Sequence, residues 1–409
     1  MCANKVVILI PIYKKTLHPC EIVSLRQVKR VLHRYKMFFL APESLVVDYG
    51  GLEDGIEFVR YPDEFFCSKN SYSAMMLDVT LYEYFIEYEY MLVYQLDAFV
   101  FSDCLLKFCN MGYDYIGAPM RRANFRTFWH READWQDIKC YVGNGGLSLR
   151  NITKCITVLK QKEYIFSRKP ECWSDNRFLE WEELFFAYSS TFSDLDFTVP
   201  DYKTALSFSV GADVAHVYQR MPEWLPFGCH AWYAIDYWHW KPIIEKQGYS
   251  LPDLKGLMMY SSRYQHVRLY VVSRYGRKDQ NHLLEKILSR FFNNRRSVVI
   301  WGWGLYGKCC KNLLDLGGVL VDKVYDKAFS NETYKDDVRF MPIDIDLIKK
   351  NKEFVIVSTI KYEDDIRKVL VEYGLVQGED FVLFSEIADD LMKSSRCYRG
   401  SSFGGKFYD

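Results

Sequence analysis

Asp97 is the first residue of this chain whose type and position could do chemistry. It closely follows Tyr90 to Tyr94, an apolar and aromatic run with the length of one buried strand. In an open α/β sheet, ligands bind at the carboxyl ends of the strands. The sequence therefore predicts a ligand-binding carboxylate at Asp97, and capping of the turn toward Ser102 and Asp103 is the structural alternative.

Two further segments carry groups that could transfer or bind protons. Glu182 and Glu183 are adjacent at the start of an expected helix, and close carboxylates raise one another's pKa, which suits a general base near neutral pH. Paired glutamates are also ordinary on helix surfaces. His230 lies in an apolar turn containing glycine, where a hydrogen-bonded core histidine is the alternative to a metal ligand.

A glycine-rich stretch and an arginine-rich stretch lie between these segments. Gly143, Gly145 and Gly146 indicate either a tight turn or a backbone that a ligand approaches closely. No Gly-Lys-Ser/Thr ending follows, so the stretch is not a phosphate-binding P-loop. Arg121 and Arg122 begin a segment with several aromatic residues, and their guanidinium groups suit phosphate or carboxylate, with a solvated loop as the alternative.

Strands and helices are expected to alternate from the N-terminus to Asp97, which predicts a parallel, right-handed βαβ sheet. The expected strands cover Val6 to Ile12, Met37 to Leu40, Phe58 to Tyr61 and Tyr90 to Tyr94, and the expected helices cover Cys20 to Tyr35 and Tyr72 to Tyr88. Such a sheet favours nucleotide binding, but a fold does not state a function.

Composition limits the classes of protein that fit this chain. Its 409 residues suggest two or three domains, and equal numbers of Lys+Arg and Asp+Glu, 53 each, argue against a general nucleic-acid binder. The 12 cysteines show no metal-binding spacing, which indicates free thiols in a reducing cytosol. The apolar N-terminal run is too short for a membrane span and reads as a buried strand.

The second half begins with a basic segment. Leu251 to Arg296 contains ten Lys or Arg and three Asp or Glu, interleaved with apolar residues. The segment is interpreted as a helical connector, and an amphipathic surface that rests on an anionic membrane is the alternative. The domains expected are 1–245, the connector 246–296, a small domain 297–390 and a disordered tail 391–409.

The small domain contains a dinucleotide-type loop. A strand, Gly302, Gly304, Gly307 and then a helix form a G-x-G-x-x-G pattern, and Asp326 follows about 20 residues later, as a ribose-binding acid would. The pattern predicts a small Rossmann-like parallel α/β domain. The domain has no second mononucleotide half and carries Trp303 inside the loop, which favours a binding or interaction role over dehydrogenase chemistry.

Several of these segments, in order, resemble a bacterial family of uncharacterised glycosyltransferase-like domains of the GT-A type. The segments are VVILIPIYKK, APESL, YQLDAFVFSD, GYDYIGAP, VGNGGLSLR and LPFGCHAW, over about residues 1 to 240. The resemblance implies a GT-A-like mixed sheet, and a nucleotide-sugar-dependent transferase in which an acidic strand end holds Mn²⁺ or Mg²⁺ on the donor diphosphate. The small C-terminal domain resembles modules appended to bacterial sugar-processing proteins.

The resemblance also assigns roles to individual residues. Asp97 matches the first acidic position of a DxD-like motif, but the second falls on Phe99, or the first on Gln95 if the motif is shifted by two residues. His230 resembles the late histidine that completes a metal site. Glu182 and Glu183 match the acidic pair of inverting enzymes, whose second member is the base. The implied donor-binding residues are Asp97, Gln95, Pro11, Tyr13, Arg121 and Arg122, and the implied acceptor-side residues are Gly145, Gly146, Asn144 and Trp232.

The leading hypothesis is a cytoplasmic glycosyltransferase that moves a sugar from a nucleotide-sugar donor to a glycan or lipid-linked glycan acceptor in bacterial surface-polysaccharide or glycoconjugate assembly. A first alternative is an NAD(P)-dependent sugar oxidoreductase that uses the C-terminal domain. A second is a non-catalytic sugar-binding protein on a decayed transferase fold, which the missing second acidic residue keeps open. The acidic, histidine and arginine positions gather in the first half, which favours the transferase.

Overall fold

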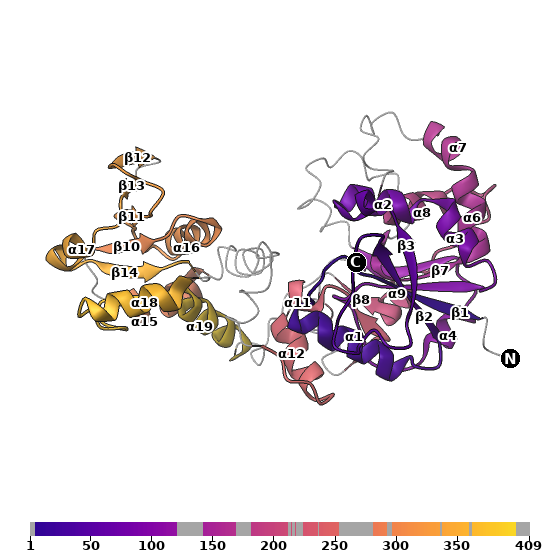
Figure 1. Cartoon of the computed structure of the whole chain (residues 1–409), viewed down its shortest axis with the longest axis horizontal. Coiled ribbons are helices and arrows are strands. Elements are labelled where there is room, and N and C mark those ends of the chain that lie inside the picture. The colour runs from indigo at the N-terminus through magenta and orange to yellow at the C-terminus, as the bar shows by residue number, and fades with distance from the viewer. Residues whose placement is uncertain are drawn as a thin grey trace. The chain divides into compact units, whose positions relative to one another are not determined.

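The computed structural model divides the chain into two compact units, Met1–Leu251 and Pro252–Asp409. It describes residues 5–120, 142–168, 181–211, 214, 217, 224–235, 237–252, 281–292, 297–335, 338–359 and 362–397. Figure 1 labels the helices and strands of each unit.

The first unit is built on a six-stranded sheet whose parallel half was predicted from the sequence. Its strand order is β3-β2-β1-β4-β7-β6, and the first four strands are parallel to one another. These four strands are β1 (Val6–Pro11), β2 (Lys36–Pro42), β3 (Glu57–Tyr61) and β4 (Tyr90–Tyr94). Their carboxyl ends meet at one edge, where the predicted site residue Asp97 follows β4.

The other two strands make the sheet mixed. Strand β7 (Val142–Asn151) runs antiparallel to both β4 and β6 (Tyr115–Met120). Of the two interpretations of this glycine-rich stretch, the tight turn is wrong, because Gly143, Gly145 and Gly146 lie within a strand that has a neighbour on each side. The register of β6 against β7 shifts between Gly117 and Ala118, where the two backbones come too close for a side chain at Gly117.

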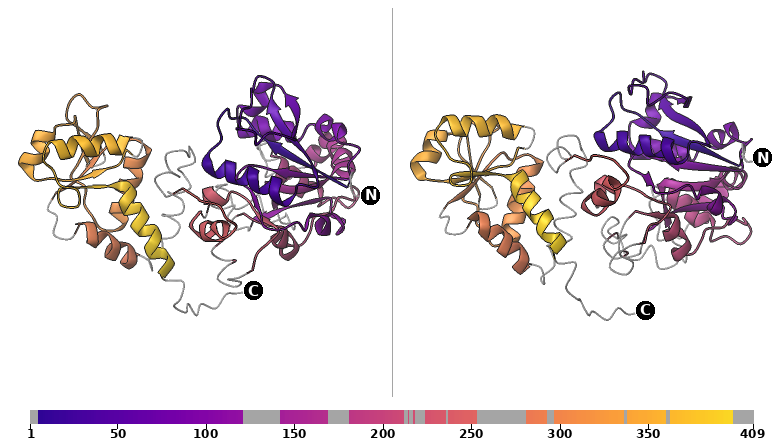
Figure 2. Two further views of the ribbon diagram at one scale, coloured as in Figure 1. Left: turned by 60° about the horizontal axis from the view of Figure 1, so that its bottom comes forward. Right: turned by 90° about the horizontal axis from the view of Figure 1, so that it is seen from below.

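Helices cover both faces of this sheet (Figure 2). Alternate residues of β1 enter two separate cores: Val7 and Leu9 join one, and Ile8 and Ile10 join the other. The helices are α1 (Pro19–Val31), α2 (Lys69–Met76), α3 (Val79–Tyr84), α4 (Leu105–Cys109), α6 (Ile152–Lys160), α7 (Lys162–Ser167), α8 (Glu182–Ser189), α9 (Tyr202–Phe208), α11 (Trp232–Ile235) and α12 (Tyr237–Glu245), with a 3-10 turn at Asp63–Phe66.

The single helix predicted for Tyr72 to Tyr88 is two helices in the structure. Asp78 separates α2 from α3, and its side chain accepts a hydrogen bond from the backbone N–H of Thr80 as the N-cap of α3. A three-stranded sheet completes the unit, in the order β5 (Phe99–Val100), β9 (Gly228–Cys229), β8 (Ser209–Val210). This small sheet brings the His230 turn next to the end of β4.

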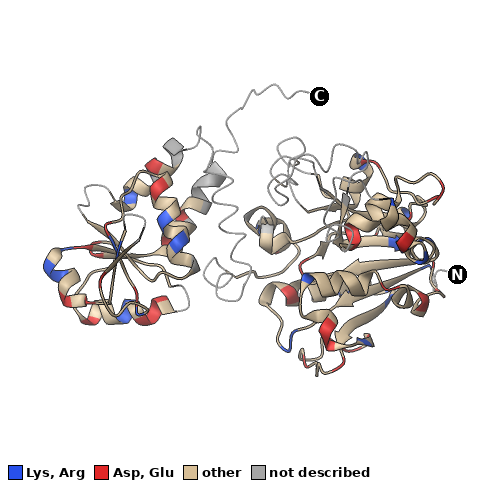
Figure 3. Ribbon diagram, turned by 90° about the horizontal axis from the view of Figure 1, so that it is seen from above, with Lys and Arg blue, Asp and Glu red and all other residues tan. Residues whose placement is uncertain are grey.

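The second unit contains a doubly wound sheet. Its order is β12-β13-β11-β10-β14-β15, with only β12 antiparallel to its neighbour. The strands are β10 (Val298–Trp301), β11 (Lys323–Tyr325), β12 (Thr333–Lys335), β13 (Val338–Met341), β14 (Phe354–Val357) and β15 (Phe381–Leu383). Acidic and basic residues alternate along several of its helices (Figure 3).

The helices of the second unit differ from two predicted domain boundaries, those of the connector and of the C-terminal tail. They are α15 (Asn281–Phe292), α16 (Leu305–Leu316), α17 (Ile345–Asn351), α18 (Glu363–Glu372) and α19 (Phe384–Cys397). Helix α15 lies in the predicted connector 246–296, yet it packs against α16 and α19 and belongs to the second unit. Helix α19 continues to Cys397, so the tail predicted from 391 begins in a helix.

The rest of the basic connector, residues 253–280 and 293–296, lies outside the described residues, and so does the expected surface for an anionic membrane. Within the described part of the chain, no helix is both long enough and apolar enough to cross a bilayer.

Candidate active site

The turn after β4 holds Asp97 at the carboxyl edge of the main sheet. The backbone N–H of Gln95 donates to the carbonyl of Gly146 on β7, and the N–H of Ala98 donates back to the carbonyl of Gln95. The carbonyl of Asp97 accepts from the N–H of Trp232. These three backbone bonds fix the turn, and the Asp97 side chain is 4% exposed. A buried carboxylate at a strand end needs a partner of opposite charge.

Among the described residues, His230 lies next to Asp97. Its backbone N–H donates to the carbonyl of Val210, and Ala231 after it adopts a left-handed backbone conformation with φ +53. This tight turn directs the imidazole toward the end of β4, where Nε2 lies 3.1 Å from Oδ1 of Asp97. Sequence reasoning predicted both residues, and the fold brings them together.

The pair suits a divalent cation. Two donor atoms about 3 Å apart match the separation of adjacent ligands around an ion with bonds of about 2.1 Å. Nε2 completes no hydrogen bond within the described residues, so it can serve as a ligand. Imidazole favours Mn²⁺ over Mg²⁺, which prefers oxygen. No group of three or more potential ligands occurs among the described side chains.

Gly146 has a local reason to lack a side chain. A Cβ at this position would collide with Nε2 and Cδ2 of His230 and would lie 2.7 Å from Oε1 of Gln95. The imidazole and the Gln95 amide therefore rest directly on the backbone of β7. The surface predicted to receive a sugar at Gly146 is occupied by side chains of the protein itself.

Gly145 also lacks a side chain for a local reason, because a second polar cluster packs against its backbone. A Cβ there would collide with Oε1 of Glu182 and would lie 3.2 Å from Nη2 of Arg150. Glu182 is buried at the first turn of α8, where its Oε2 accepts from Oγ of Ser73 at 2.7 Å and its Oε1 lies 3.5 Å from Nη2 of Arg150. The two adjacent glycines thus separate the Asp97 and His230 pair from the Glu182 and Arg150 pair.

Arg150 is fully buried, and every nitrogen of its guanidinium has a partner. Nε donates to Oγ of Ser148 at 3.0 Å, Nη1 donates to the hydroxyl of Tyr82 at 2.8 Å, and Nη2 donates to the carbonyl of Gly145 at 3.4 Å. The guanidinium also lies over the rings of Tyr115 and Phe186. Such complete pairing is what allows a permanent positive charge inside a protein.

The carboxyl of Glu183 has a raised pKa. Burial raises the pKa of Glu183 well above its usual range, and the adjacent carboxylate of Glu182 raises it further by its negative charge and by a hydrogen bond. The Arg150 guanidinium opposes this effect only weakly. The paired glutamates are therefore not equivalent: Glu182 is held by a guanidinium, whereas Glu183 retains a proton to higher pH.

Tyr72 connects the two clusters. Its hydroxyl lies close enough to Gln95 for an interaction that lowers its pKa, although burial, the largest effect, and the charge of Glu182 raise that pKa overall. Within the described residues, no group forms a hydrogen bond of good geometry with this buried hydroxyl. A polar row therefore runs from Asp97 through Gln95 and Tyr72 to Glu182 and its two partners, Ser73 and Arg150.

The other predicted ligand contacts have different positions. Pro11 is buried at the end of β1, and Tyr13 is 52% exposed with Lys14 over its ring. Asn144 accepts from the N–H of Gly146. Trp232 has no exposed surface, and its indole Nε1 donates to Ser24, so its predicted acceptor contact is corrected to a packing role. Arg121 and Arg122 lie outside the described residues.

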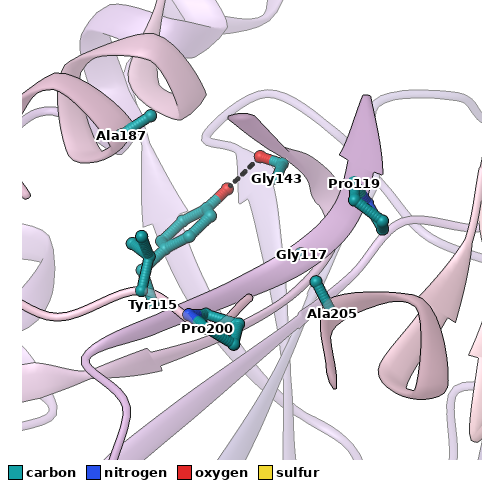
Figure 4. A pocket seen from close by; sticks show the side chains of 8 residues that line it. Tyr115, Gly117, Pro119, Gly143, Ala187, Pro200 and Ala205 are labelled. Atoms are coloured by element: carbon teal, nitrogen blue, oxygen red, sulfur yellow. Dashed lines mark hydrogen bonds between the residues drawn. The ribbon is translucent and has the colours of Figure 1, made fainter. Parts of the chain in front are cut away.

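A small apolar pocket lies next to the polar row, between β6, β7, α8 and α9 (Figure 4). The Tyr115 hydroxyl donates to the carbonyl of Gly143 at its rim, and Pro119, Ala187 and Pro200 line its walls. The pocket volume is about 10 Å³, room for a single water molecule. Among the described residues that line it, Tyr115 is the titratable one.

The predicted glycine loop of the second unit connects β10 to α16. Gly302 has φ +106, and a Cβ on Gly307 would collide with the carbonyl of Gly302, so both glycines serve the loop itself. Both carboxylate oxygens of Asp326 accept from backbone groups: Oδ2 from the N–H of Trp303 at 2.5 Å and Oδ1 from that of Ala328 at 2.8 Å. The carboxylate of Asp326, the predicted ribose contact, is therefore hydrogen-bonded to the backbone of its own unit.

Sequence reasoning missed three members of the polar row. Arg150 was quoted only as the end of a motif, and Ser73 and Tyr72 lie in a helix that carried no chemical signal. The available signal was the alternation of β7, which places Ser148 and Arg150 on one face of a buried strand. A charged residue at a core position of such a strand indicates a paired charge.

Comparisons with known proteins give limited information on function. Residues 55–230 match a family model described as a protein of unknown function, DUF5672. No curated protein matches the chain. Similar solved structures include the galactosyltransferase LgtC with donor and acceptor sugar analogues, at 13% identity and TM-score 0.41, covering 60% of this chain and 98% of LgtC.

Two further structures have comparable similarity. Mouse xyloside xylosyltransferase 1 has 12% identity and TM-score 0.32, covering 56% of this chain and 97% of its own. The bifunctional glycosyltransferase WbbM has 11% identity and TM-score 0.37, covering 60% of this chain and 52% of its own. The chain is similar to these glycosyltransferase structures at TM-scores of no more than 0.41, so any function has to rest on the geometry of its own residues.

Proposed function

We propose that the first unit is a glycosyltransferase that moves a sugar from a nucleotide-sugar donor to a hydroxyl of a glycan or lipid-linked glycan acceptor. One observation carries this proposal: Asp97 and His230 converge at the carboxyl edge of β4, and the carboxylate of Glu182, which begins α8 next to Glu183, lies against the adjacent Gly145. One side can bind a cation, and the other side can exchange a proton. Displacement at an anomeric carbon requires both.

The reaction is proposed as a single displacement with inversion. The acceptor hydroxyl attacks the anomeric carbon, and its proton passes to the carboxylate of Glu183. The new oxygen–carbon bond forms as the bond from the anomeric carbon to the diphosphate breaks, and the electron pair leaves with the nucleoside diphosphate. Asp97 and His230 would hold Mn²⁺, which would neutralise the charge that develops on the diphosphate.

The cellular setting is proposed from the sequence alone. Neutral net charge, scattered cysteines and the basic segment suggest a cytoplasmic protein of surface-polysaccharide or glycoconjugate assembly, with peripheral contact to the inner membrane face. The test is flotation with vesicles that contain anionic lipids. Failure to float with these vesicles would remove the membrane contact and leave the transferase proposal intact.

Thermal-shift titration of the full chain tests the proposed activity. UDP and GDP are compared with NAD(H), each with and without Mn²⁺, because a ligand that binds only the folded state raises the unfolding midpoint. We expect a shift with one nucleoside diphosphate and Mn²⁺, absent in Asp97→Ala. Glu87→Gln is a matched control, since this exposed carboxylate precedes β4 at its opposite end.

If a nucleoside diphosphate raises the unfolding midpoint, the next experiment is an activity assay. Release of the nucleoside diphosphate from its sugar conjugates is measured with Mn²⁺, and turnover distinguishes an enzyme from a sugar-binding protein on the same fold. A response to NAD(H) alone, abolished by Asp326→Ala, would instead support the oxidoreductase alternative and contradict the proposal.

A further inference from the structure

Tyr72 differs from other tyrosines in the core of the first unit in its hydrogen bonding. The hydroxyls of Tyr82, Tyr94 and Tyr115 each donate to a backbone carbonyl at 2.9 to 3.0 Å. The Tyr72 hydroxyl is covered by protein atoms as well, yet no group within the described residues completes a hydrogen bond with it. A buried donor without an acceptor lowers the stability of a folded protein, so its presence indicates a role other than folding.

Helix α2 directs this hydroxyl into the polar row. The start of the helix is fixed, because the Ser68 hydroxyl caps its first turn and the Ser68 carbonyl accepts from the backbone N–H of Tyr72. The next residue, Ser73, donates to Glu182. Successive side chains of a helix point about 100° apart, so these two neighbours reach different parts of the row, and Tyr72 lies beside Gln95.

The Tyr72 hydroxyl keeps its proton near neutral pH and can donate it in a hydrogen bond. Burial, and then the negative charge of Glu182, raise its pKa. The nearby amide of Gln95 lowers this pKa, which is the effect of a donor that approaches the phenol oxygen. Oε1 of the same amide lies against Gly146. The proton of Tyr72 is therefore available to an acceptor that enters the row.

Tyr72 lies at the place in the row where the proposed reaction puts the transferred sugar. Under the proposed function, the cation and the diphosphate lie at Asp97 and His230, and the acceptor hydroxyl loses its proton at the start of α8. The anomeric carbon is bonded to the diphosphate and attacked by the acceptor, so its sugar ring lies between these two ends. Gln95 and Tyr72 occupy this interval, and the side chain of Tyr72 is partly exposed there.

We propose that the Tyr72 hydroxyl donates a hydrogen bond to a hydroxyl of the transferred sugar and thereby selects sugars that carry an oxygen at that position. This inference rests on the proposed function for its ligand, a nucleotide-linked sugar. A site that hydrogen-bonds a substrate hydroxyl rejects the analogue that lacks it, because a buried protein group is then left unpaired. The protein alone carries the cost of the unpaired Tyr72 hydroxyl, and the matching sugar removes it.

Binding to the full chain separates the sugar from the nucleotide. Isothermal titration with Mn²⁺ compares UDP with UDP-glucose and UDP-galactose, and GDP with GDP-mannose. We expect Tyr72→Phe to weaken binding of the sugar conjugate about three- to tenfold, as for the loss of one neutral hydrogen bond, and to leave binding of the bare diphosphate unchanged. Tyr84→Phe removes an exposed hydroxyl of α3 and is the matched control.

Deoxy analogues of the conjugate that binds then locate the hydroxyl. Wild type should lose its advantage over Tyr72→Phe for the one analogue that lacks the hydroxyl in contact with Tyr72, and should keep it for the other deoxy analogues. A merely structural effect of Tyr72→Phe would instead weaken every conjugate and the bare diphosphate alike, and would contradict the proposed contact.

A stability measurement tests the unpaired hydroxyl in the absence of any ligand. Tyr72→Phe removes a buried donor without a protein acceptor, so we expect urea unfolding to show no loss of stability, or a gain. Tyr94→Phe removes a hydroxyl that lies within hydrogen-bonding distance of two backbone carbonyls and should destabilise the protein. Equal destabilisation by both substitutions would overturn the inference, because the Tyr72 hydroxyl would then already have a partner, such as an ordered water.

The binding results distinguish failure of this inference from failure of the proposed function. If wild type binds none of the nucleoside diphosphates or their sugar conjugates, the proposed function is rejected, and the sugar contact of Tyr72 with it. If wild type binds a conjugate and Tyr72→Phe binds it as tightly, the transferase proposal stands and the sugar contact is rejected.

Discussion

Nε2 of His230 lies 3.1 Å from Oδ1 of Asp97, although the two residues are far apart in the sequence of the first unit. The small sheet of β5, β9 and β8 creates this proximity, because Phe99 pairs with Cys229 directly before the histidine turn. Two residues in different segments therefore form a single candidate cation site.

Replacement of either member of this pair should weaken Mn²⁺ binding. Asp97→Ala and His230→Ala each remove one of two protein donors, and we expect the affinity for Mn²⁺ with nucleoside diphosphate to fall at least about tenfold, or about 1.4 kcal/mol. Isothermal titration measures the change. Equal affinity in wild type and both variants, with Glu87→Gln as the control, would argue against a cation at this site.

The two glycines of β7 should respond differently to a single methyl group. Gly146→Ala pushes against His230 and Gln95 and should abolish the Mn²⁺-dependent nucleotide shift, whereas Gly145→Ala pushes against Glu182 and should alter the proton-transfer side. Each overpacked variant should lose about 1–3 kcal/mol of stability. Gly304→Ala meets no atom within 4 Å and is the control. Identical effects at both positions would contradict the separation into two clusters.

Glu183 should make stability fall as pH rises. Its pKa in the folded protein is raised, so the unfolded chain releases this proton first, and the stability present below about pH 4.5 is lost as pH rises toward the folded value. The slope from this group is at most about 1.4 kcal/mol per pH unit. Glu183→Gln should flatten the dependence measured by denaturant unfolding, and a slope unchanged by the substitution would show that Glu183 carries no such proton.

We expect the hydrogen bond between Trp232 and Ser24 to stabilise the folded protein without contributing to ligand binding. Ser24→Ala removes the acceptor of its indole N–H inside the core, at a cost of about 1–3 kcal/mol. Urea unfolding measures this loss, and Ser102→Ala on the surface should stay within about 0.5 kcal/mol. A loss of nucleotide binding in folded Ser24→Ala would restore a ligand role for this part of the site.

Asp326 should stabilise its own loop. Asp326→Ala leaves the N–H groups of Trp303 and Ala328 without their acceptor, and we expect the second unit to lose about 1–2 kcal/mol of stability without any change in response to NAD(H). Unfolding followed by circular dichroism checks the first part, and thermal shift checks the second. An NAD(H) response that vanishes in this variant would return the dinucleotide loop to consideration.

The parallel half of the main sheet was predictable from the sequence because its strands are continuous apolar runs. Tyr90–Tyr94 matched the prediction residue for residue, and Asp97 followed from its place after that strand. The antiparallel β7 was not predicted, because its glycines indicated either a tight turn or a close approach of a ligand. Only the contacts of Gly145 and Gly146 with Glu182 and His230 explain why a strand should carry them.

The polar row was harder to predict than the strands. Arg150, Ser73 and Glu182 come from three elements, and their pairing depends on how α2 and α8 pack over β7. Sequence spacing carries no information on that packing. Trp232 was misassigned for the opposite reason: an aromatic residue beside a histidine turn suggests sugar stacking, but here its indole fills the space under α1.

Helix α15 precedes the first strand of the second unit in the chain, yet its Leu284 and Leu288 lie against Gly317 at the end of α16, and Phe292 packs on Phe354. A fragment that starts at Ser297, where the strand pattern begins, would therefore leave an apolar floor open to water and should aggregate on expression. A fragment that starts before Asn281 retains its own covering helix, and it is the piece to express when the role of this unit is studied alone.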